Sequence, residues 1–193
     1  MAYSTDFIEP YMDVTAPNEE HDAAPCIPES MARLEAIYRD EMWLSCMAEI
    51  EAAEDERRYC KHDISHLMDV ARIAYIYSLE EDLKLARDVI YAAALLHDIG
   101  RSAEYRSGVS HDEAGAIAAA EILSRSHFTE NERAAIINSI RNHRGSNCVS
   151  EDSSNALQVI IKRADKQSRL CFACEASETC NWSEEKKNHS IEY

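Results

Sequence analysis

Histidine and aspartate side chains on the predicted inner faces of helices are the strongest chemical signal in this sequence. His66, His97, His143 and Asp165 all occupy positions that hydrophobic periodicity assigns to the interior. A core histidine bonded to a carbonyl, or an Asp165–Lys166 ion pair, would explain any one of them. Several together favour a metal centre, because helical cores build metal sites from side chains on facing helices. Mixed imidazole and carboxylate ligands suit Mn, Fe, Co, Ni or Zn better than Ca.

The elements that must position these residues are predicted to be helices. The 193 residues include only four glycines and four prolines, which favours helix over a turn-rich β fold. Predicted caps are Asp63 and two capping boxes, Ser110-x-x-Glu113 and Thr129-x-x-Glu132. The expected helices cover residues 29–50 (one long helix or two), 63–78, 83–97, about 111 onward, about 130 to a stop at Gly145, and 153–169, with Gly100 ending the third.

Charge and composition restrict the partners and the compartment. Asp and Glu outnumber Lys and Arg by 36 to 20, a net charge of −16 that repels nucleic-acid polymers and anionic membranes. A small phosphorylated molecule remains compatible, because a bound cation dominates the local field. The first residues do not resemble a signal peptide, and no apolar run reaches the roughly 20 residues of a membrane span. We therefore expect a cytoplasmic protein, and self-association into a homo-oligomer is compatible with this sequence.

The motifs resemble those of a known family. The order His66, then His97-Asp98, then Asp165 resembles the H…HD…D signature of the HD-domain metal-dependent phosphohydrolases. The stretches HLMDVARIA, AALLHDIGR and IIKRADKQSR are similar to the HD motifs, over about residues 55–170. The resemblance implies an all-α, HD-domain-like bundle, here of about six or seven helices within residues 29–169. An N-terminal arm (1–28) would precede it, and a cysteine-containing tail (170–193) would pack on it.

The resemblance also implies a ligand set. His66, His97, Asp98 and Asp165 would bind one divalent ion, chosen among Mn, Fe, Co, Ni, Zn and Mg. Some HD proteins hold two metals with the HD aspartate as bridge, and here the additional ligands would be His111 and His143. His111 also begins a predicted helix, where the positive dipole end keeps an imidazole neutral. The other histidines, His62 included, lack this positioning.

The expected activity is metal-assisted hydrolysis of a phosphoester, with a nucleotide or nucleotide-like molecule as the substrate class that the resemblance favours. Asp98 would hold the metal and orient the attacking water, while Arg101 and Lys166 are candidate phosphate clamps. Arg141 and Arg144 are further candidates. Two alternatives stay open: an HD-type di-iron oxygenase of a small substrate, and a non-catalytic HD module that only binds a ligand.

The tail has its own pattern of potential ligands. Cys171-x-x-Cys174-x5-Cys180 contains the C-x-x-C half of a structural zinc site. A fourth ligand would come from Cys60, Cys148 or His189, and the sequence does not choose among them. Packing cysteines or a redox pair are the alternatives. Because the tail follows Asp165 closely, it is expected to fold back over the mouth of the site.

Overall fold

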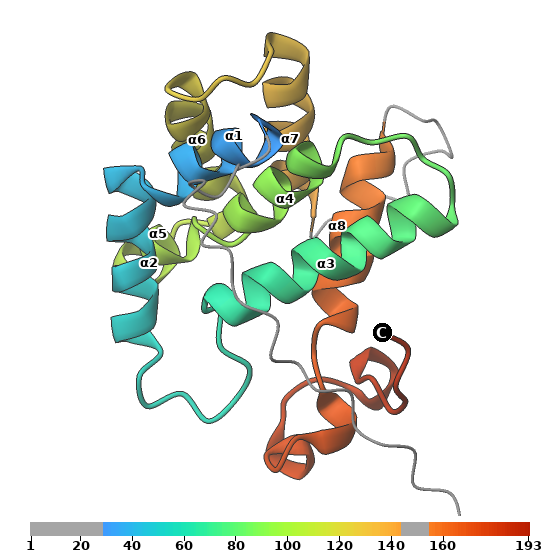
Figure 1. Cartoon of the computed structure of the whole chain (residues 1–193). Coiled ribbons are helices and arrows are strands. Elements are labelled where there is room, and N and C mark those ends of the chain that lie inside the picture. Colours follow the sequence, from blue (N-terminus) through green and yellow to red (C-terminus); the bar gives the residue numbers. More distant parts are fainter. Residues whose placement is uncertain (1–28, 144–154) are drawn as a thin grey trace, which may run out of the picture.

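The described part of the chain, residues 29–143 and 155–193 of a computed structural model, is entirely helical (Figure 1). This confirms the predicted all-α class. The α-helices are α1 (Glu29–Tyr38), α2 (Glu41–Ala53), α3 (Ile64–Glu80), α4 (Arg87–Leu96), α5 (Arg101–Ser107), α6 (His111–Ser124), α7 (Glu130–Asn142) and α8 (Ala156–Gln167). Three short 3-10 helices follow in the tail, η2 (Cys171–Ala173), η3 (Ser177–Thr179) and η4 (Glu184–Lys186). The expected arm (1–28) lies outside the described residues.

Helix α4 is the centre of the molecule, in contact with α1, α3, α7 and α8. Its apolar sequence VIYAAALL explains this central position. Ala92, Ala93 and Ala94 are fully buried, and their small side chains let neighbouring helices approach closely. The indole N–H of Trp43 on α2 donates to the carbonyl of Leu95 at 3.0 Å. The end of α4, where the His97-Asp98 pair follows, is thus fixed from several sides.

The described residues form eight α-helices where six or seven were predicted, and the division of residues 29–50 into two helices was one of the two predicted alternatives. Residues 29–50 divide into α1 and α2 because the Asp40 carboxylate accepts from the backbone N–H groups of Met42 (2.9 Å) and Trp43 (3.4 Å), which makes it an N-cap. The seven-residue α5 directly after the His-Asp turn was not predicted. A helix that short leaves no hydrophobic period to detect.

Gly100 does not end a helix by adopting a left-handed conformation, because its φ is −69° and α4 already ends at Leu96. Instead, Gly100 allows helices α5 and α6 to approach each other closely. A Cβ at position 100 would lie 2.1 Å from the His111 carbonyl oxygen and 2.3 Å from the Gly115 nitrogen. Only glycine therefore allows the start of α6, and with it His111, to lie against the His-Asp turn.

The predicted caps have mixed outcomes. Asp63 caps α3 by accepting from the His66 N–H, and Thr129 forms the complete capping box with Glu132, as predicted. The Ser110 box is wrong: Ser110 precedes α6, but its side chain makes no capping bond. The predicted stop at Gly145 lies outside the described residues. No helix in the described ranges is long and apolar enough to cross a membrane.

Candidate metal centre

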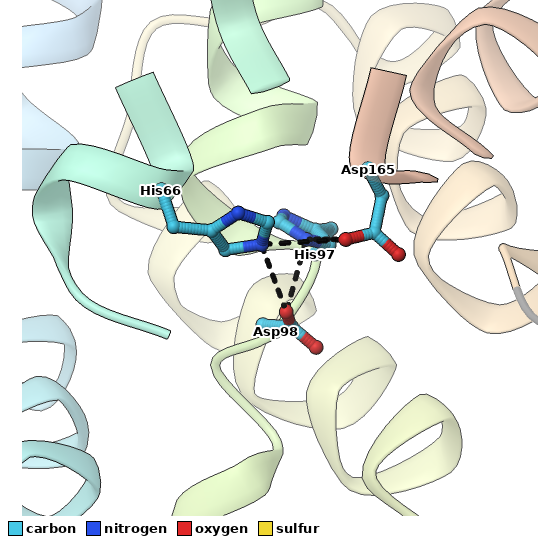
Figure 2. A group of neighbouring side chains, drawn as sticks. All are labelled: His66, His97, Asp98 and Asp165. Atoms are coloured by element: carbon cyan, nitrogen blue, oxygen red, sulfur yellow. Dashed lines mark ion pairs between the residues drawn. The ribbon is translucent and has the colours of Figure 1, made fainter. Parts of the chain in front are cut away.

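Four side chains predicted as metal ligands converge in the structure (Figure 2). His66 comes from α3, His97 and Asp98 from the turn after α4, and Asp165 from α8. One donor atom from each lies within 4.8 Å of the others. The His66 Nε2 atom is 3.5 Å from Asp98 Oδ2 and 3.3 Å from Asp165 Oδ1, and His97 Nε2 is 3.0 Å from Asp98 Oδ2. Residues about 100 positions apart in sequence thus form one compact donor set.

Hydrogen bonds on the far side of the imidazoles fix which nitrogen faces the centre. His97 donates from Nδ1 to the Ala94 carbonyl at 2.7 Å, and His66 Nδ1 lies 3.1 Å from the Ser168 hydroxyl. That hydroxyl donates to the Asp165 carbonyl at 2.7 Å, so it can only accept from His66. Both Nε2 atoms therefore face the centre, which is the orientation that metal-ligating histidines show.

A second donor group shares one residue with the first. Asp98, His111 and His143 also place donor atoms within 4.8 Å of one another, and all three are buried. The Nδ1 atoms again face outward, since His143 donates to the Ile140 carbonyl at 2.6 Å and His111 is 2.8 Å from a Glu104 carboxylate oxygen. Asp98 is therefore the residue that the two donor groups share.

Buried atoms without partners show that these residues fit a cation. Within the described ranges, His97 Nε2, Asp98 Oδ2 and Asp112 Oδ1 are buried and have no hydrogen-bond partner. An unsatisfied buried polar atom costs about 1–3 kcal/mol, and more when it is charged. Three such atoms at one place indicate a site where a bound divalent ion would provide the partner that these nitrogen and oxygen atoms lack.

The electrostatics of the centre favour positive charge. Burial would raise the pKa of Asp98, but the positive charge of His97, the neighbouring His66 imidazole and the Arg101 guanidinium hold it well below its usual value. Burial would lower the pKa of His97, yet the Asp98 and Asp165 carboxylates outweigh it and raise that pKa to about 10. The carboxylates thus attract either a proton or a metal ion to the same nitrogen, and the two compete.

The structure adds two residues that sequence reasoning missed. His62 is only 4% exposed, and its Nε2 lies 3.9 Å from Asp98 Oδ2 while Nδ1 contacts Glu54 at 2.5 Å. It precedes the N-cap of α3, so no helical period marks it. Asp112 lies beside His111, with its Oδ1 atom 3.0 Å from His111 Nε2. The dipeptide His111-Asp112 repeats the His97-Asp98 pairing, and that repetition was the available signal.

A cavity of about 490 Å³ opens onto the centre. His62, His143 and Asp165 line its inner side. Its cations are Arg57, Arg101, Arg169 and Lys187, and its aromatic side chains are Tyr59 and Trp182. Tail residues, among them Trp182 and Lys187, form part of its lining.

The predicted phosphate clamps have different positions. Arg101 lines the cavity and donates from Nε to Asp98 Oδ1 at 2.7 Å. Lys166 is exposed and does not line it. Arg169, which lies one helical turn beyond Asp165, does line the cavity. Its guanidinium donates to His66 Nε2 at 2.9 Å. Arg141 is exposed and is not among the cavity residues, and Arg144 lies outside the described residues.

The predicted zinc ligands Cys171, Cys174 and Cys180 also line this cavity. In the part of the chain that the structure describes, the donor groups that lie within 4.8 Å of one another contain no cysteine. The zinc site therefore stays a prediction.

This chain belongs to the HD domain family. The family model matches residues 63–170, a range that contains helices α3 to α8 and every predicted ligand of the histidine-aspartate centre. This membership supports a metal-dependent phosphohydrolase superfamily, and the described site contains histidine and aspartate groups that could hold a metal ion.

Individual relatives span different shares of the chain. An uncharacterised protein of Clostridium beijerinckii is 38% identical over 163 residues, which cover 84% of this chain and 100% of that protein. Ribonuclease Y of Enterococcus faecalis is 30% identical over 109 residues, 55% of this chain but only 18% of the ribonuclease. A crystal structure described as a predicted HD superfamily hydrolase from an uncultured Thermotogales bacterium has a TM-score of 0.55 and 28% identity, covering 76% of this chain and 79% of that one.

Proposed function

We propose that this protein hydrolyses a phosphoester bond in a small phosphorylated molecule, a nucleotide or a nucleotide-like compound. One observation carries the proposal: Asp165 and His143, one from each group of imidazole and carboxylate donors, line a cavity whose walls also hold arginines and aromatic rings. A divalent ion at the centre would supply Lewis-acid chemistry, because it lowers the pKa of water towards about 7 and neutralises phosphoryl charge. His66, His97, Asp98 and Asp165 would hold it.

The chain's own residues then divide the remaining tasks. Arg101 and Arg169 both contact the centre, Arg101 at Asp98 and Arg169 at His66 and Asp165. A guanidinium presents paired N–H donors in one plane, which matches the oxygens of a phosphate group. The two arginines would orient the phosphate over the centre, while Tyr59 and Trp182 offer ring surfaces that suit a base.

Asp98 is suited to orient the attacking water. Its Oδ1 accepts from Arg101, whereas its buried Oδ2 has no hydrogen-bond partner among the described residues and faces the imidazole nitrogens. One oxygen is thus fixed by the arginine, and the other remains to accept a proton or a ligand contact at the centre.

The test is a metal and substrate screen with matched variants. Protein loaded with Mn²⁺, Co²⁺, Ni²⁺, Mg²⁺ or Fe²⁺ is incubated with nucleoside mono-, di- and triphosphates and with bis(p-nitrophenyl) phosphate, and the release of phosphate or nitrophenol is measured. We expect turnover that Arg169→Ala weakens by about tenfold to a hundredfold, since a charge-assisted hydrogen bond contributes about 1.5–3 kcal/mol. Arg72→Ala is the control, because Arg72 is exposed on α3 and pairs with the neighbouring Asp69, away from the centre.

Two outcomes would contradict the proposal. No phosphoester hydrolysis with any of these metals would exclude the activity. Substrate-dependent O2 consumption by the iron-loaded protein would instead support a di-iron oxygenase, which the shared position of Asp98 in both donor groups makes the second candidate.

A further inference from the structure

Four cysteines gather at one wall of the cavity, away from the helices that carry the histidine-aspartate ligands. Cys60, Cys171, Cys174 and Cys180 all line it, and all four are half-buried free thiols. The fifth described cysteine, Cys46 on α2, lines a different hollow. Four thiolates are the number that a closed, tetrahedral structural zinc site uses.

Hydrogen bonds bring Cys60 to the tail from both of its neighbours. The hydroxyl of Tyr59 donates to the carbonyl of Thr179 at 2.9 Å, directly before Cys180. On the other side, Arg169 donates to the carbonyl of Lys61 at 3.0 Å, two residues before Cys171. The segment around Cys60 is therefore held against both ends of the stretch that contains the three tail cysteines.

The other two residues that the sequence offered as a fourth ligand are less suitable. His189 is exposed, does not line the cavity, and uses its Nε2 atom to contact the Glu184 carbonyl at 2.9 Å. Cys148 lies outside the described residues. Cys60 alone among the three is placed by the structure at the wall that the tail cysteines form.

The tail lacks the apolar burial that would hold it in place. Its helices are three residues long, and Ala176 is its only buried hydrophobic residue. Leu170, Phe172 and Ile191 are exposed. Short segments that bury so little apolar surface generally need a cross-link or a metal ion to keep one conformation.

The thiols lie in a mixed electrostatic environment. Burial raises the pKa of the Cys60 thiol, Arg169 lowers it, and charge on Cys171 or Cys174 would raise it. The Lys187 side chain, only 7% exposed, donates to the Ser177 carbonyl at 2.8 Å within the same wall. A divalent ion would relieve the repulsion between thiolates, and Lys187 would offset the remaining negative charge.

We propose that Cys60, Cys171, Cys174 and Cys180 bind a structural zinc ion that fastens the tail to the segment before α3. The four sulfurs do not yet form a donor group within 4.8 Å, so their side chains must rotate about the Cα–Cβ bond to converge on the ion. This site is separate from the histidine-aspartate centre, and it stands whether or not the protein hydrolyses phosphoesters. It would make the tail a fixed wall of the substrate cavity.

The test removes the first metal centre and asks whether a second metal remains. In His97→Ala/Asp98→Ala protein, elemental analysis should find about one zinc per chain, and replacement by Co²⁺ should give a thiolate-to-cobalt charge-transfer band in the near ultraviolet. Adding Cys60→Ser or Cys174→Ser should abolish both signals. Adding Cys46→Ser, the matched control, should leave them unchanged. Zinc and the cobalt band persisting in the Cys60→Ser protein would overturn the assignment.

A measurement on the wild-type chain covers the case in which a cysteine variant does not fold. X-ray absorption at the zinc edge should show sulfur neighbours at about 2.3 Å, and titration with an organomercurial should release zinc to a chromophoric chelator as the thiols react. Zinc with only nitrogen and oxygen neighbours would overturn the proposal. Iron with acid-labile sulfide in place of zinc would overturn it as well.

Discussion

The histidine-aspartate centre and the cysteine-lined tail face the same cavity, yet they are positioned in opposite ways. The centre is positioned by helices, because His66 and Asp165 project from α3 and α8, and Trp43 braces the turn that carries His97 and Asp98. The tail is positioned by a few hydrogen bonds and three-residue helices. Packing therefore preorganises the donors of the first region before any ion binds, whereas the second region needs its ion to become ordered.

The largest expected effect is the loss of the residue that both donor groups share. Asp98→Asn removes a carboxylate while it keeps the shape of the side chain. We expect the centre to lose its metal and turnover to fall by about a thousandfold or more, since metal-based charge stabilisation contributes several kcal/mol. Metal analysis and phosphate release measure the two effects. The thiolate-bound zinc should remain, and full occupancy of the first centre in this variant would contradict the ligand assignment.

A smaller effect is expected when an outer hydrogen bond to a ligand is removed. Ser168→Ala deletes the acceptor for His66 Nδ1, so the imidazole loses its fixed orientation. Loss of such a partner lowers metal affinity by about tenfold to a hundredfold. Competition with a chelator measures the change. Ser107→Ala is the control, because its hydroxyl binds only the Ala103 carbonyl on the exposed face of α5. Equal affinity in the two variants would show that packing alone orients His66.

The contrast between the two regions also explains which parts the sequence could predict. Hydrophobic periodicity fixes the faces of α3, α4 and α8, so His66, His97 and Asp165 were identifiable as convergent. Arg169 lies four residues after Asp165, about one helical turn, whereas Lys166 is directly adjacent to it. This spacing would have indicated that Arg169, rather than Lys166, lies beside Asp165. His62 precedes its helix, so no period applies to it.

The position of Cys60 illustrates what periodicity cannot supply. It is 111 residues before Cys171 in the sequence, and only the packing of α8 against α3 brings the two segments together. The close approach at Gly100 is similar, because the clash that glycine avoids involves α6. Long-range contacts of this kind follow from the tertiary fold and leave no local pattern in the sequence.

The stability of the fold in acid tests the contribution of the buried Glu54 carboxylate and its hydrogen bonds. Burial would raise the pKa of Glu54, but hydrogen bonds from His62 and Tyr105 lower it to about 2. The carboxylate therefore stabilises the fold above its unfolded pKa of about 4.5, and this contribution is lost as the pH falls from about 4.5 towards 2. Glu54→Gln should lower the free energy of unfolding by about 1–2 kcal/mol at pH 7. Urea titrations should show that the difference from wild type shrinks below pH of about 4.5, and a pH-independent difference would contradict this account.

The smallest expected effect concerns a single hydrogen bond that holds the tail. Tyr59→Phe removes the donor to the Thr179 carbonyl, an exposed bond that contributes about 0.5–1 kcal/mol. If the thiolate-bound ion holds the tail, limited proteolysis should hardly detect this loss in wild type. In Cys60→Ser protein the same substitution should release the tail to protease, because the hydrogen bonds would then be its main attachment. Tyr75→Phe, whose ring packs against Tyr91, is the control. A larger effect of Tyr59→Phe on cleavage in Cys60→Ser protein than in wild type would therefore show that the tail is ordered by its ion. An equal effect in the two proteins would show that hydrogen bonds and packing suffice, as they do for the histidine-aspartate centre.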